Sequence, residues 1–222
     1  MSNKSVGLNN RPHVSLRVVP LRRASALCGC VVVLLGWGTA LRGESPIALT
    51  VRIYNAAGLP SPLVVAAREA AEPILRDVGL QVAFRYCGVR FADVNTVVDR
   101  CDEALKPGEV IVRIIDTPPP SPTLNPLAYG ISYIARHTDT GWLATVFADR
   151  VVSAASRVGL EQRTFLGLVL AHEVGHLLLG ESHADVGLMR AQWPDAELNR
   201  AAAAWRFTPD EAATLQARIQ DR

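Results

Sequence analysis

Residues 171–189 read AHEVGHLLLGESHADVGLM and hold three of the chain's five histidines. His172 and His176 are four residues apart, so on an α-helix their imidazoles stand one turn above the other on one face. Gly180 can end that helix in a left-handed turn, which glycine adopts without steric cost, and the chain can then bring His183 back to the first two. Three histidines with a fourth position open form a catalytic zinc site, whereas structural zinc usually has four protein ligands. The stretch therefore predicts a site for one Zn²⁺ ion.

Glu173 directly follows the first histidine, so its side chain points about 100° further around the helix. That direction places a carboxylate near the metal without making it a ligand. Zinc makes water acidic enough to supply hydroxide near neutral pH, and a neighbouring carboxylate can take the proton and pass it to a leaving amine. We interpret Glu173 as this general base. The alternative is that the HExxH pattern arose by chance on an ordinary helix.

The helix that carries these residues is apolar nearly all round, which predicts a buried central helix beginning near Glu161. Histidine and glutamate side chains inside such a helix are costly unless something satisfies them. Its apolar residues are Phe165, Leu166, Leu168, Val169, Leu170, Val174, Leu177, Leu178 and Leu179.

The segment HEVGHLLLGESH, followed by Gly187-Leu188-Met189, resembles the zinc-binding segment and Met-turn of the metzincin metallopeptidases. The order of predicted elements is similar over about residues 47–219. The resemblance implies a zinc endopeptidase of α+β (mixed α/β) fold: a twisted mixed sheet of about five strands, a backing helix, a central active-site helix and a C-terminal helix. It also implies roles for five residues, namely ligands at His172, His176 and His183, a base at Glu173, and a hydrophobic base beneath the metal at Met189.

The spacing departs from the family pattern at one residue. The family has glycine three residues after the second histidine, whereas Gly180 is four after His176. One residue is about 100° of helix rotation, so His183 reaches the metal only if the helix ends differently. Otherwise Asp185 or Glu181 takes the third place. A carboxylate from a following helix, Glu197, is a further alternative, and it would make the protein a different zinc hydrolase. A non-catalytic zinc-binding or interaction module is the remaining rival.

The rest of the chain predicts five strands and three more helices. Strand, helix and strand in succession predict a parallel βαβ unit, and the polar turn RHTDTG joins the last two strands as a hairpin with one exposed edge, where an extended peptide can dock. The proline-rich segment 117–126 is either a rim of the cleft or a connector. The strands are expected at 47–54, 80–86, 109–115, 128–135 and 142–147, and the helices at 61–79, at 149–158 and from Thr208 onward.

Residues 1–43 have the composition of a targeting segment, with six basic and no acidic residues. The uncharged run 24–41 ends in small residues that suit cleavage after Ala40, which predicts a signal peptide and a secreted or periplasmic protein. An uncleaved N-terminal membrane anchor is the alternative, and it would be the chain's only link to a membrane. Residues 44–222 are expected to form a single catalytic domain.

Removal of the leader leaves two cysteines, Cys87 and Cys101. An even number in an exported chain predicts a disulfide, with two unpaired thiols as the alternative. From Glu44 on, 17 basic residues face 21 acidic ones, a net charge of −4. This balance, without a basic stripe interleaved with aromatic residues, argues against a nucleic-acid partner. The expected partner is a peptide or protein substrate, and the expected state is a monomer.

Overall fold

The computed structural model describes residues 47–88, 101–198 and 204–220. The leader expected at residues 1–43 lies outside these ranges, so its cleavage or anchoring stays a prediction. Within the described ranges, none of the helices is both long and apolar enough to cross a membrane. The described residues all belong to one compact unit.

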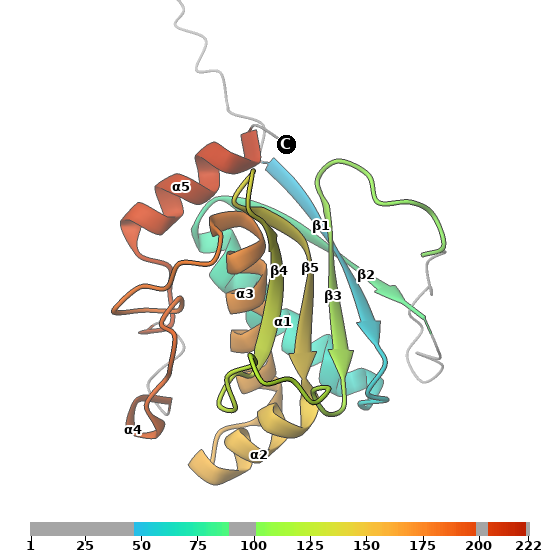
Figure 1. Ribbon diagram of the computed structural model, residues 1–222, viewed down its shortest axis with the longest axis vertical. Coiled ribbons are helices and arrows are strands. Elements are labelled where there is room, and N and C mark those ends of the chain that lie inside the picture. Colours follow the sequence, from blue (N-terminus) through green and yellow to red (C-terminus); the bar gives the residue numbers. More distant parts are fainter. Residues whose placement is uncertain (1–46, 89–100, 199–203, 221–222) are drawn as a thin grey trace, which may run out of the picture. The chain divides into compact units, whose positions relative to one another are not determined.

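Five strands form one mixed sheet in the order β2-β1-β3-β5-β4, which confirms the expected sheet (Figure 1). The first four strands in this order are parallel, and β4 runs antiparallel to β5 at the edge, as the predicted βαβ unit and hairpin require. The strands are β1 (Ile47–Asn55), β2 (Leu80–Cys87), β3 (Glu109–Ile115), β4 (Gly130–Ala135) and β5 (Thr140–Phe147).

The hairpin differs from its sequence-based prediction at both of its starts. β4 begins at Gly130 instead of Ala128, and β5 begins at Thr140 instead of Trp142. Backbone pairing of Ala135 with Thr140 carries the ladder into the polar turn, past a register shift between Tyr133 and Ile134. The sequence pattern did not predict this pairing because the turn has polar side chains, whereas the pairing is made by backbone groups.

Two helices, α1 and α3, lie side by side against one face of the sheet (Figure 1). Alternate strand residues such as Val51, Val112 and Ile114 point to this face and are fully buried. A Cβ atom on Gly167 of α3 would lie 2.6 Å from the Cβ of Ala70 in α1, so glycine allows the two helices to approach closely. The helices are α1 (Ser61–Asp77), α2 (Ala148–Val158), α3 (Gln162–Leu179), the short α4 (Asp195–Leu198) and α5 (Pro209–Gln220).

The helix α3 is the central element, with 13 of its 18 residues buried. It contacts α1, α2, α5 and the strands β3, β4 and β5, which confirms the buried helix that its sequence predicts. α5 begins with reciprocal bonds, in which the Glu211 N–H donates to Thr208 Oγ1 (3.3 Å) and the Thr208 N–H donates to the Glu211 carboxylate (2.7 Å). These bonds satisfy backbone groups at the start of α5, which packs against α3.

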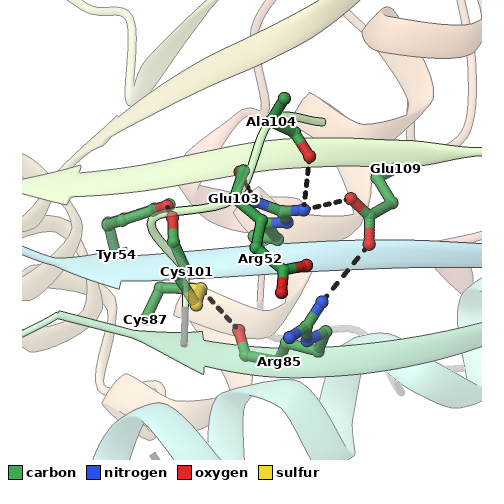
Figure 2. Close-up of a disulfide and its surroundings, with 8 residues drawn as sticks. All are labelled: Arg52, Tyr54, Arg85, Cys87, Cys101, Glu103, Ala104 and Glu109. Atoms are coloured by element: carbon green, nitrogen blue, oxygen red, sulfur yellow. Dashed lines mark hydrogen bonds and ion pairs between the residues drawn. A yellow bond between two sulfur atoms is a disulfide. The ribbon is translucent and has the colours of Figure 1, made fainter. Parts of the chain in front are cut away.

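A disulfide joins Cys87, at the end of β2, to Cys101, with Cα atoms 5.4 Å apart. Its presence confirms the pairing expected from the cysteine count. Figure 2 shows the segment after Cys101 crossing β1, on the face opposite α1 and α3. The Tyr54 hydroxyl of β1 donates to the Cys101 carbonyl oxygen (2.9 Å). The disulfide and this bond hold the crossing segment to the sheet.

The same segment buries Arg52, whose side chain is 1% exposed. Its guanidinium donates to the carbonyl oxygens of Glu103 (2.7 Å) and Ala104 (3.1 Å) and pairs with Glu109 (Figure 2). Burial acts to raise the pKa of Glu109. A hydrogen bond from the Lys106 N–H and the positive charges of Arg52 and Arg85 outweigh this effect, so the pKa is lowered. Arg52 is thus a buried charge that is paired with Glu109 and bonded to two carbonyl oxygens.

Removal of the disulfide should lower the free energy of unfolding by about 3 kcal/mol. The disulfide joins residues 14 positions apart and so restricts the conformations of the unfolded chain. The Cys87→Ser/Cys101→Ser variant should unfold at a lower urea concentration than the wild type. A reductant should bring the wild type to the same midpoint. If neither treatment moved the midpoint, the Arg52 contacts alone would hold the segment.

Candidate metal site

Three histidines converge where the chain leaves α3. His172 and His176 lie on consecutive turns of the helix, and His183 lies in the loop that follows. The Nε2 atom of His176 is 3.0 Å from His172 Nε2 and 3.1 Å from His183 Nε2. One nitrogen from each ring falls within 4.8 Å of the others. The structure therefore brings together the three histidines that the spacing singled out.

Gly180 explains how His183 reaches this position despite the extra residue. The helix continues through Leu179, and the Gly180 N–H still donates to the His176 carbonyl oxygen (2.9 Å). The backbone then leaves at φ +96° and ψ −164°, a conformation that only glycine adopts readily. A Cβ atom at this position would also overlap the Asp139 carboxylate of the β4–β5 turn.

The hairpin turn is held against this helix end by α5. Arg218 of α5 donates to Asp139 Oδ2 (2.9 Å) and to the Leu178 carbonyl oxygen of α3 (3.2 Å). One guanidinium therefore joins three elements at the place where the chain turns toward His183. The position of the third histidine depends on this contact between distant parts of the chain.

The three carboxylates considered as alternative ligands lie outside the histidine group. Among the described residues, the group whose ligand atoms come within 4.8 Å of one another contains histidines alone. Glu197 accepts a hydrogen bond from Arg190 (2.9 Å) and lines a separate smaller cavity together with Asp185. Glu181 is exposed and lines the same cleft as the histidines.

Two backbone carbonyls determine which nitrogen of each buried ring carries the proton. His172 Nδ1 is 2.8 Å from the Leu188 oxygen, and His176 Nδ1 is 2.8 Å from the Gly180 oxygen. A carbonyl oxygen can only accept, so both Nδ1 atoms donate and both Nε2 atoms keep a lone pair in the neutral ring. This is the usual way in which a protein orients metal-ligating imidazoles.

Burial keeps these rings neutral. Burial, with a smaller effect from His176, lowers the pKa of His172 to about 3, and burial lowers the pKa of His176 to about 4. Burial also lowers the pKa of His183. Neutral Nε2 atoms 3.0 Å apart then face each other with no proton between them. A cation would satisfy these lone pairs, so the donor set fits a zinc ion.

Glu173 lies beside the histidines and is 3% exposed. Ser132 of β4 donates its hydroxyl to Glu173 Oε2 (2.8 Å). A Cβ atom on Gly130 would lie 2.5 Å from Glu173 Oε1, so the glycine gives the carboxylate its space. Burial raises the pKa of Glu173 to about 7, against the lowering effect of the Ser132 bond. A carboxyl group with this pKa can exchange a proton near neutral pH.

Ser132 and Gly130 belong to no sequence motif of the site. Strand alternation indicates that residues 130 and 132 share a face, and the pairing of Ser132 with the inward-facing Ala144 shows that this face is the helix side. The sequence holds no signal for the height at which α3 crosses the strand. Their contact with Glu173 is therefore a tertiary feature.

Met189 is fully buried against the C-terminal half of α3. A Cβ atom on Gly175, between the two helical histidines, would lie 2.6 Å from Met189 Sδ. The Ala184 N–H donates to the Met189 carbonyl oxygen (2.9 Å), which closes the turn that follows His183. This methionine therefore packs on the helix that carries His172 and His176.

The histidines open into a cleft of about 760 Å³. β4 lines one side of it, and Thr123, Leu124 and Asn125 of the proline-rich segment also line it. Arg150 of α2 donates to the carbonyl oxygens of Asn125 (3.1 Å) and Ala128 (2.6 Å), which anchors this segment. The proline-rich segment is therefore a rim of the cleft.

Substitution of Gly180 by alanine should destabilise the protein more than the same change at Gly159. Both glycines have positive φ, but a Cβ atom on Gly159 meets nothing within 4 Å, whereas one on Gly180 overlaps Asp139. We expect a cost of about 1 kcal/mol at Gly159 from the backbone alone and a clearly larger cost at Gly180, measured by denaturant unfolding. Equal costs would show that the turn moves freely at Gly180.

Comparison with known proteins identifies the fold. No family model and no curated protein matches this sequence. Among solved structures, archaemetzincin from Methanopyrus kandleri is similar with a TM-score of 0.50 and 16% sequence identity, over 82% of this chain and 99% of that chain. The chain has an archaemetzincin-like mixed α/β fold.

Proposed function

We propose that the chain is a zinc-dependent metalloendopeptidase that hydrolyses bonds in peptides or proteins. The observation that carries this proposal is the convergence of three imidazole Nε2 atoms beside a buried, hydrogen-bonded carboxylate in an open cleft. The archaemetzincin-like fold supports it. His172, His176 and His183 would hold one zinc ion, and Met189 packs beneath them.

A zinc ion bound by three imidazoles with one position open would lower the pKa of a bound water molecule toward neutral pH and polarise a carbonyl oxygen. The remaining steps belong to the chain's own residues. Glu173 takes a proton from the attacking water and delivers it to the leaving amine nitrogen as the carbon–nitrogen bond breaks. Ser132 holds Oε2 of this carboxylate, which leaves Oε1 for the proton.

The strand β4 suits a peptide substrate because it lies at the edge of the sheet. Its backbone pairs with β5 on one side, and among the described strands it has no partner on the other. An extended chain can add to such an edge through backbone hydrogen bonds. Ser132 belongs to this strand and contacts Glu173, so the edge and the proposed base are adjacent.

The Glu173→Gln variant should keep its zinc and lose about 10²–10⁴-fold in kcat/KM, the usual contribution of a positioned base. Zinc content would be measured by atomic absorption and cleavage with a peptide library. Glu181→Gln, which changes an exposed carboxylate in the same cleft, should retain both. Full activity of Glu173→Gln would refute the mechanism. A wild type that binds zinc but cleaves no peptide would favour the non-catalytic module.

Zinc affinity in ligand variants should identify the third ligand. His183→Ala should weaken zinc binding by more than the 10–100-fold typical of an outer-shell residue, whereas Asp185→Ala and Glu197→Ala should leave it close to the wild-type value. Competition with a chromophoric chelator measures all three. A loss confined to Glu197→Ala or Asp185→Ala would instead indicate a zinc hydrolase with a carboxylate ligand.

We further propose that the protein is exported, with residues 1–43 as a signal peptide or, alternatively, an N-terminal anchor, and residues 44–222 as the catalytic domain. The basic, then apolar, composition of the leader supports export. The disulfide also supports it, because disulfides persist mainly in oxidising compartments. The mass of the mature protein distinguishes the two alternatives, since cleavage after Ala40 removes the leader.

A further inference from the structure

The carbonyl oxygen of Leu188 accepts two hydrogen bonds. One comes from His172 Nδ1 at 2.8 Å and the other from the indole Nε1 of Trp193 at 3.1 Å. A carbonyl oxygen has two lone pairs, so these donors use its full capacity. Trp193 is only 7% exposed, and its N–H is therefore committed to this carbonyl.

The indole ring also contacts the imidazole ring directly. The centroids of Trp193 and His172 are 5.3 Å apart with planes at 89°, an edge-to-face arrangement. Other rings also pack on the indole, among them Phe165 of α3, which is edge-to-face at 5.8 Å, and Tyr129, just before β4, which stacks at 6.1 Å. A rotation of the His172 ring would lose both its carbonyl bond and this ring contact.

We propose that Trp193 is a positioning residue for His172. It acts through its hydrogen bond to the Leu188 carbonyl and through the edge-to-face contact between the two rings. This inference rests on the proposed function, because it takes His172 as a metal ligand. Trp193 restricts the imidazole to the orientation in which its Nε2 points toward His176 and His183. Since Leu188 precedes the buried Met189, the same bond fixes the turn beneath the histidines. Tyr129 and Trp193 both line the cleft, so the positioning residue forms part of its wall.

A neighbouring tryptophan provides a matched control. Trp205 is 3% exposed and lies 5.5 Å from Trp193 between ring centroids. Its Nε1 has no hydrogen-bond partner among the described residues. Trp205→Phe therefore removes the same atoms from the same cluster without breaking a bond to the Leu188 carbonyl.

The test compares the zinc affinity of full-length wild type, Trp193→Phe and Trp205→Phe by chelator competition. We expect about 10-fold weaker binding in Trp193→Phe, at the lower end of outer-shell effects, and a value within about twofold of wild type in Trp205→Phe. The Co²⁺-substituted proteins should show an altered visible absorption spectrum in Trp193→Phe alone, because that spectrum reports ligand geometry. Equal losses in both variants, or no loss in Trp193→Phe, would overturn the inference.

A second variant covers the case in which Trp193→Phe does not fold. Incorporation of 3-benzothienylalanine at position 193 keeps the shape of the indole and replaces its N–H by sulfur. We expect a loss of zinc affinity close to that of Trp193→Phe, and wild-type affinity would show that the hydrogen bond has no positioning role. A wild type that binds no zinc would refute the proposed function itself, whereas tight wild-type binding with no change at position 193 refutes only this inference.

Discussion

Two neutral imidazoles on consecutive turns of a buried helix face each other with their Nε2 atoms 3.0 Å apart, and the structure around them maintains that contact. The helix α3 packs against the sheet, α1, α2 and α5, which fixes the part of the backbone that carries His172 and His176. Their Nδ1 protons are bound to carbonyl oxygens, and burial opposes a second proton on either ring. A metal ion is the simplest partner for nitrogens held in this way.

The two carbonyls come from the two places where the chain turns after α3, and side chains outside α3 hold each turn. Asp139 of the β4–β5 hairpin fills the space beside Gly180, with Arg218 of α5 binding the hairpin and the helix end together. Trp193 holds the carbonyl of Leu188. The orientation of each imidazole therefore depends on packing beyond the helix, which is how outer contacts tune a metal site.

The two faces of the sheet make different contacts. One face packs on α1 and α3, and at its edge β4 brings Ser132 and Gly130 to Glu173. On the opposite face, the disulfide and the buried Arg52 hold the segment after Cys101 across β1 (Figure 2). Because β1 and β4 are separated by two strands, the disulfide stabilises the sheet without contacting the cleft.

The sequence by itself determined the features that arise from local spacing. Strand alternation, apolar helical periodicity and turn residues located the sheet and its helices to within about two residues, and the separation of His172 and His176 places them on one helix face. The two cysteines that follow the leader predicted the Cys87–Cys101 disulfide, because each is the other's only possible partner in that part of the sequence. Only the tertiary structure shows that His183, and none of the three carboxylates, lies in a group with His172 and His176. One residue rotates a helix by about 100°, and the turn at Gly180 packs on Asp139, about 40 residues away. Ser132 and Trp193 likewise reach the site through contacts between elements, and such contacts leave no periodic signal in the chain.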